Sequence, residues 1–251
     1  MYARKFAQTL LGGVIACVFC FPLAHAGGRL IVQPELGFFS LSGVDTETTA
    51  DAVVSTIYNW GLSFTWLQGM TNKAEGFIKV GARAYGLNSP GSAKVLNPNQ
   101  DTVDFAVGVR RPMGGRLNLS LFLSLNQYVL MKSASITQIR LDNGRWPGAG
   151  LEMEYLLFRI RSVQLLLALG GGAAIPLDNS GYGIDLGAYG RSMLTFSIKR
   201  FGFMIGPYAR LQTVSSSIIT QYYAEIGATL LVGITFGKQK GRYMFSFSPR
   251  K

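Results

Sequence analysis

The chain has 251 residues, 24 of them basic and 13 acidic, and it is rich in glycine and aromatic residues. Beyond the first 26 residues it has no uninterrupted apolar run of 18, which excludes a membrane-spanning helix from that part. Two cysteines are too few for a disulfide-stapled scaffold. Three classes of basic, β-rich exported protein stay open: a membrane barrel, a secreted domain that binds polyanions, and a soluble sandwich.

The first 26 residues have the organisation of a secretory signal peptide. Arg4 and Lys5 precede an apolar run over about 10–23, and Ala24-His25-Ala26 forms an A-x-A cleavage site. We therefore expect a signal peptide over 1–26 and cleavage after Ala26. An alternative is a lipoprotein signal with a lipid on Cys17. Both cysteines and the single histidine, His25, lie in this segment, and without it the net charge is +9.

Residues of alternating polarity recur along the rest of the chain, and a period of two is typical of β-strands. The last such segment is the most regular: every second residue from Tyr222 to Phe236 is apolar or aromatic, and the others are mostly polar or small. It is also longer than an ordinary globular strand. In total the pattern predicts ten strands, over about 29–41, 53–67, 76–86, 102–111, 116–130, 149–158, 162–175, 182–198, 201–213 and 222–236.

The connections between these segments alternate in length. Tight turns are expected around 71–73, 112–115, 159–161 and 198–200. Longer loops are expected at 43–52, 88–101 and 131–148, with shorter connections on the same side at 176–181 and 215–217. An even number of amphipathic strands, with tight turns at one end and loops at the other, is the pattern of transmembrane barrels.

The chain resembles the bacterial outer-membrane β-barrel class. That resemblance implies an antiparallel up-and-down barrel of about ten strands over 27–237, in the outer membrane, with its tight turns on the periplasmic side. The terminal strand of such barrels commonly ends on an aromatic residue, as at Phe236. Here a basic tail, 238–251, follows, and its Tyr243–Phe247 stretch is an alternative terminal signal that leaves the strand count open.

This topology sorts the side chains into outer and inner sets. The aromatic girdle is expected to comprise Tyr58, Trp60, Trp66, Tyr222 and Phe236. The charged residues predicted to face the lumen are Glu35, Lys79, Arg83, Asp104, Arg110, Glu152, Glu154, Asp185, Arg191, Arg210 and Glu225. Their net charge is −1, against −2 for the loops and +12 for the turn side and tail.

These charges bear on partners. Outer-membrane lipids are the expected surroundings, and the basic turn side suits anionic lipid headgroups or an acidic periplasmic partner. Nucleic acid is a poor partner for an exported chain with this distribution. Inside a barrel of about ten strands, side chains nearly fill the lumen, which favours a plug of ion pairs over an open, narrow pore.

The sequence favours a non-enzymatic role: structural, partner-binding or as a narrow pore. Without His25 no histidine is left for Ser-His or Asp-His catalysis, and no cofactor or metal site is expected. The alternative is a barrel-embedded hydrolase that uses lumen carboxylates, with Glu152 and Glu154 as the best pair. A soluble sandwich is disfavoured because the apolar faces of the second, fifth and tenth segments would need covering.

Overall fold

The computed structural model describes residues 28–45, 51–71, 74–134, 137–160, 163–177, 182–198, 200–216 and 219–236. The expected signal peptide, with Cys17 and His25, and the basic tail lie outside the described residues. The strands are β1 (Gly28–Asp45), β2 (Asp51–Thr71), β3 (Ala74–Asn88), β4 (Lys94–Leu96), β5 (Asn99–Pro112), β6 (Leu117–Ala134), β7 (Gln138–Ile160), β8 (Val163–Ala174), β9 (Tyr182–Ile198), β10 (Phe201–Ser216) and β11 (Ile219–Thr235).

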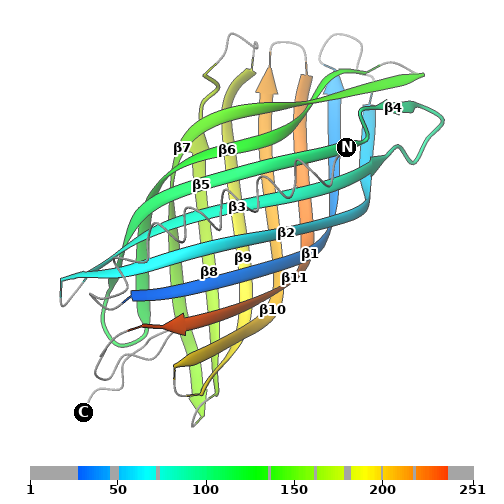
Figure 1. Cartoon of the computed structure of the whole chain (residues 1–251). Coiled ribbons are helices and arrows are strands. Elements are labelled where there is room, and N and C mark those ends of the chain that lie inside the picture. The colour runs from blue at the N-terminus through cyan, green and yellow to red at the C-terminus, as the bar shows by residue number, and fades with distance from the viewer. Residues whose placement is uncertain are drawn as a thin grey trace.

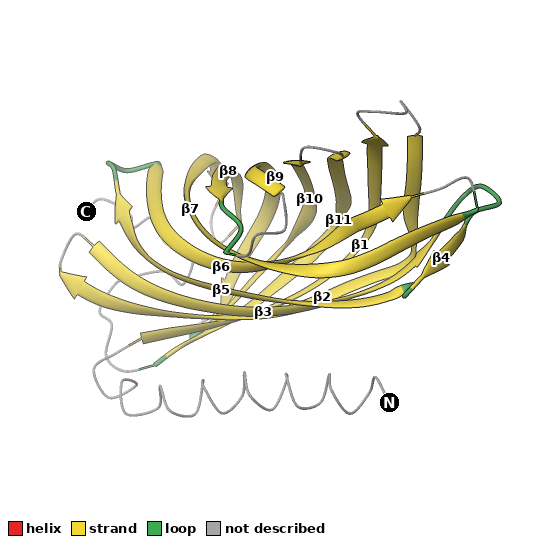
Figure 2. Cartoon of the chain, turned by 90° about the horizontal axis from the view of Figure 1, so that it is seen from above, coloured by secondary structure: helices red, strands yellow, loops and turns green. Residues whose placement is uncertain are grey.

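Ten of these strands are long and close into a barrel (Figures 1 and 2). Each pairs antiparallel with its neighbours along the chain, and β1 pairs with β11 to complete the ring. The short β4 stands apart, since it pairs in parallel with the start of β7 (Figure 1). The predicted ten-stranded, up-and-down antiparallel barrel is therefore confirmed.

The outer surface carries the apolar set that the alternation predicts. Leu36, Leu121, Leu123 and Ile226 are 67%, 58%, 64% and 61% exposed. Their neighbours in sequence point inward: Glu35, Ser120 and Glu225 are buried. An apolar exterior around a closed sheet is the surface that a bilayer covers. No helix long and apolar enough to cross a membrane is found among the residues that the structure describes.

Two predicted features differ from the structure. The stretch 131–148, expected to be a loop, is mostly strand, because β6 continues to Ala134 and β7 begins at Gln138. The second strand is not one uninterrupted alternation: its register against β3 shifts between Thr56 and Tyr58. Ile57, at that irregularity, is 73% exposed, and the inward phase changes from even to odd residue numbers.

Candidate functional site

An apolar cluster lies inside the barrel near its loop end. Its members come from strands all around the wall, so they meet across the lumen rather than along one side. We call it the mouth cluster: Phe39, Leu41, Ala52, Val54, Tyr85, Leu87, Val129, Leu130, Met131, Ile139, Leu141, Trp146, Ala174, Val214 and Tyr223. Trp146 is fully buried in it and packs edge-on against Tyr128, with ring centroids 5.3 Å apart.

The extended ends of β6 and β7 cross this mouth. We call residues 127–134 and 138–147 the mouth hairpin. The Gln221 side chain of β11 donates to the Met131 carbonyl at 2.8 Å and accepts from the Met131 N–H at 2.9 Å. The Tyr223 hydroxyl donates to the Val129 carbonyl at 2.8 Å. Because β6 and β11 are not neighbours in the sheet, these bonds fasten the hairpin to the opposite wall.

A second apolar cluster lies inside the barrel at the turn end. It comprises Ile31, Leu67, Leu156, Leu166, Met193, Met204 and Leu231, with Phe77 packed against it. Near it Arg29 and Glu75 form a buried ion pair. Both belong to the charges that the sequence assigns to the turn side, and both do lie at that end, but their side chains point into the lumen. Arg29 is two residues from Ile31, and Glu75 two from Phe77, so both share the inward phase of their strands.

Between the two apolar clusters lies a layer of charge. In its first group Arg83 forms ion pairs with Glu35 and with Glu225, the latter at 2.8 Å from Nη1 to Oε2. Arg210 reaches the same Glu225 oxygen at 3.1 Å. Asn59 also donates to Glu225, at 2.8 Å. This group joins β1, β2, β3, β10 and β11 across the lumen.

The second group lies on the other side of the lumen. Arg191 of β9 contacts Glu152 at 2.9 Å and Glu154 at 3.4 Å. Arg110 of β5 pairs with Glu154 as well, and Asn118 donates to that carboxylate at 3.4 Å. The two neighbouring carboxylates proposed as a catalytic pair are therefore both held by arginines.

Tyrosine hydroxyls complete both groups, and glycines make room for their rings. Tyr208 donates to Glu225 at 2.7 Å, and Tyr189 donates to Glu152 at 2.7 Å. A Cβ at Gly170, on the strand beside Tyr189, would lie 2.4 Å or more from ring atoms of that tyrosine, closer than real side chains pack. The wall glycines thus let aromatic rings lie flat inside a narrow lumen.

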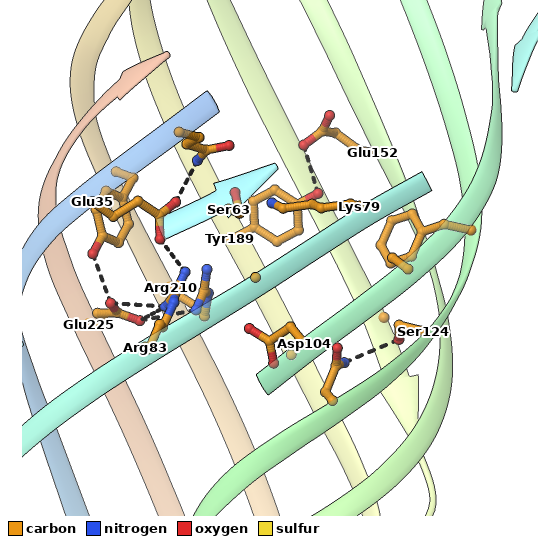
Figure 3. Close-up of a pocket in the computed structure, with 18 of the residues that line it drawn as sticks. Glu35, Ser63, Lys79, Arg83, Asp104, Ser124, Glu152, Tyr189, Arg210 and Glu225 are labelled. Carbon is orange, nitrogen blue, oxygen red and sulfur yellow. Dashed lines mark hydrogen bonds and ion pairs between the residues drawn. The ribbon is translucent and has the colours of Figure 1, made fainter. Parts of the chain in front are cut away.

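The remaining predicted lumen charges, Lys79, Asp104 and Asp185, also face inward but lie outside these groups. Asp185 accepts a hydrogen bond from Gln212 at 2.9 Å. Lys79 and Asp104 form no ion pair or hydrogen bond within the part of the chain that the structure describes. They line a chamber of about 340 Å³ that extends between the two apolar clusters (Figure 3).

The five girdle residues belong to the outward-pointing sets of their strands, although Trp66 is buried, and they are not all at the strand ends. Tyr58 and Tyr222 are 46% and 49% exposed, and the Tyr58 hydroxyl donates to Asn99 at 3.0 Å. Trp66 and Phe236 pack together at the turn end, with ring centroids 5.9 Å apart. Trp60 lies opposite Leu36 and Ala84, near the middle of β2.

Sequence reasoning missed several residues that lie inside the lumen near its two ends. Gln221 and Trp146 gave no signal, because the first lies before the predicted strand and the second in a predicted loop. Alternation alone could have found Arg29 and Glu75: Arg29 lies in the first predicted strand, in phase with Glu35, and Glu75 lies one residue before the third, in phase with Lys79. Within the described ranges, His, Cys, Asp and Glu side chains nowhere gather in the groups of three or more that could hold a metal ion.

Comparison with known proteins identifies the fold. No protein family model matches the sequence, and neither does the sequence of any curated protein. Among solved structures, the outer membrane protease OmpT from Escherichia coli is similar over 84% of this chain and 96% of its own, with 10% identity and a TM-score of 0.51.

Two further structures match more loosely. LpxR from Salmonella typhimurium covers 83% of this chain and 99% of its own, with 8% identity and a TM-score of 0.42. An outer membrane channel, COG4313, from Pseudomonas putida F1 covers 84% and 96%, with 9% identity and a TM-score of 0.42. At such identities the likeness concerns the fold alone. The likeness to OmpT and the closed ring of ten antiparallel strands give the chain the fold of the bacterial outer-membrane β-barrels, the class that its sequence resembles.

Proposed function

We propose that this chain is a non-enzymatic, integral protein of the outer membrane whose barrel is closed at rest. One observation carries the proposal: a cluster of buried apolar side chains lies in the lumen at each end of the charged layer. Water and ions cross a barrel through a continuous polar path, and apolar constrictions interrupt such a path. The role is structural, with the interior serving as a plug.

The ion pairs support this role because they join strands that are not neighbours. Arg83 connects β3 to β1 and β11, and Arg191 connects β9 to β7. Removing one partner of a buried ion pair leaves an uncompensated charge, which destabilises a protein by about 3–5 kcal/mol. The network therefore fixes the shape of the wall.

The alternative of a hydrolase is less well supported. Glu152 and Glu154 are both paired with Arg191, so neither carboxylate is available to a substrate without breaking an ion pair. OmpT is a protease, but a shared fold does not imply a shared activity. No specific observation in the lumen favours a substrate-cleaving constellation.

The exposed arginines at the turn end support a lipid or protein partner there. Arg111, Arg116 and Arg200 are all exposed at that end. Bilayer lipids would surround the apolar belt. Anionic headgroups, or an acidic periplasmic protein, would complement these arginines.

Planar bilayer recording tests the closed state. Folded protein inserted into a bilayer should give no steady ion conductance, because the two apolar clusters interrupt the path. Flotation of the same preparation with vesicles would establish that it inserts. A stable, stepwise conductance in salt solution would contradict the proposal and favour the narrow pore.

A further inference from the structure

Two exposed arginines lie on the outer face of the wall, one at each border of its apolar belt. On β5 the outward residues of 103–109 are exposed and apolar, and Arg111 is the next outward residue toward the turn end. On β7 the outward residues of 147–155 carry no charge, and Arg145 is the next outward residue toward the loop end. Both arginines are exposed, whereas a sequence neighbour of each is buried in the lumen.

The belt between the two arginines is about as tall as a membrane requires. Arg111 lies opposite Leu119 of β6, and Arg145 lies opposite Gln127 of the same strand. The eight-residue step from Leu119 to Gln127 is about 27 Å of strand, and a tilt of about 35–45° makes it cross about 20 Å of membrane. The apolar band of such barrels is about 25 Å tall. Each arginine therefore lies near one border of the band, and its long side chain can extend to the headgroups. The outward residues of β6 within this step are Leu121, Leu123 and Leu125.

The protein supplies no counter-charge to either arginine. Glu75, at the start of the adjoining β3, is buried and paired with Arg29. Beside Arg145, the Gln127 amide oxygen already accepts a backbone N–H of β5 at 3.2 Å. Neither Arg111 nor Arg145 forms an ion pair with any residue that the structure describes. A positive charge thus stands unbalanced at each border of the belt.

We propose that Arg111 and Arg145 bind the phosphate groups of membrane lipids, one in each leaflet, and so set the depth of this side of the barrel in the bilayer. A guanidinium group binds phosphate through two parallel N–H donors. Lipid phosphates lie just beyond the hydrocarbon layer on both sides, at the height to which the two side chains extend. The inference rests on the membrane-spanning barrel proposed above and names lipid phosphate as a partner of its wall.

Arg116 provides a matched control for Arg111. It belongs to the same connection between β5 and β6 and is also exposed. Its carbonyl accepts the Leu156 N–H at 2.8 Å, and the Leu156 side chain is buried. Residues opposite each other in an antiparallel pair share a face, so Arg116 is in the inward phase of β6 and does not lie beside lipid.

Phosphate binding is tested by unfolding the full-length protein from two kinds of vesicle. One is phosphatidylcholine, and the other is digalactosyl diacylglycerol, an uncharged lipid without phosphate. In phosphatidylcholine, Arg111→Gln and Arg145→Gln should each raise the unfolding equilibrium constant by about twofold to fivefold, the range usual for exposed ion pairs. In the galactolipid neither substitution should change it. Arg116→Gln should have no effect in either vesicle.

The depth claim is tested with phosphatidylcholine vesicles of increasing chain length. Arg111→Leu combined with Arg145→Leu lengthens the apolar belt at both borders. The double variant should therefore be most stable in a thicker bilayer than the wild type is. Arg111→Lys with Arg145→Lys keeps both charges and should keep the wild-type optimum, with a smaller phosphate effect because lysine lacks the paired donors.

Three results would overturn the proposal. The first is an effect of Arg111→Gln and Arg145→Gln that is equal in the two lipids or absent from both. The second is an effect of Arg116→Gln as large as that of Arg111→Gln, since any charge at this end would then serve. The third is an unchanged thickness optimum in the leucine double variant. Flotation and bilayer conductance test insertion and closure separately, so failure of the proposed function is distinguishable from failure of this inference.

Discussion

At the scale of single residues, Arg83 is the centre of the interior. It is buried and pairs with both Glu35 and Glu225. Arg83→Met would leave the buried Glu35 without an ion pair and Glu225 with Arg210 alone, so we expect a loss of about 3–5 kcal/mol in the free energy of unfolding. Denaturant titration of the protein folded in liposomes measures this change in the free energy of unfolding.

Lys79→Met is the matched control for Arg83→Met. Both positions lie on β3 and point into the same lumen, but Lys79 forms no ion pair among the described residues. Lys79→Met should therefore lower the free energy of unfolding by clearly less than Arg83→Met does. Equal losses for the two variants would mean that burial of the long side chain, and not ion pairing, stabilises this layer.

The sequence predicted which charges face inward but not their partners. Period-two alternation assigns Glu35, Arg83 and Glu225 to one face of their strands, and all are buried there. Which arginine meets which glutamate depends on strand stagger and barrel curvature, and neither can be obtained from alternation. Pairing of Arg83 with a residue 142 positions away is therefore visible only in the folded chain.

At the scale of elements, β6 offers the sharpest test of which side chains face lipid and which face the lumen. Leu121 is 58% exposed on the outer face, while Ser124 faces the chamber opposite Ala106. An arginine facing lipid at mid-membrane costs about 2–4 kcal/mol. Leu121→Arg should therefore lower the unfolding free energy in liposomes by about that amount.

Ser124→Arg should lower the unfolding free energy by less than Leu121→Arg does. The chamber has room for the new side chain, and the Asp104 carboxylate lies on the adjacent strand. Ser120 is a poorer control, since it is buried opposite Arg110 and a second arginine there would meet the same charge. A larger loss for Ser124→Arg than for Leu121→Arg would show that the leucine face of β6 is not in lipid.

The mouth hairpin shows where local sequence signals fail. Asp142-Asn143-Gly144 and Pro147-Gly148 have the composition of turns, so a loop was predicted there. In the structure β7 passes straight through them, because Leu141 and Trp146 are buried in the mouth cluster and β6 pairs alongside. Tertiary burial outweighs local preference for these residues.

At the scale of the whole molecule, the barrel has two unlike ends, each with a buried apolar cluster, and a charged layer between them. Strand count, antiparallel order and outer face could be predicted because membrane barrels repeat one simple pattern. The two apolar clusters could not be predicted, because they are assembled from residues of many strands. The closed, membrane-spanning arrangement also fixes which connections share a side: Gly91 lies at the loop end, and Gly115 joins β5 to β6 at the turn end.

Labelling of these two glycines as cysteines tests the membrane-spanning barrel most directly. Both positions are exposed, and a Cβ there meets no atom closer than 3.8 Å, so neither substitution should disturb the fold. A membrane-impermeant maleimide should modify Gly91→Cys on intact cells and Gly115→Cys only after the outer membrane is permeabilised. Equal labelling of both variants on intact cells, or of neither before permeabilisation, would contradict a barrel that spans the outer membrane with its loops outside.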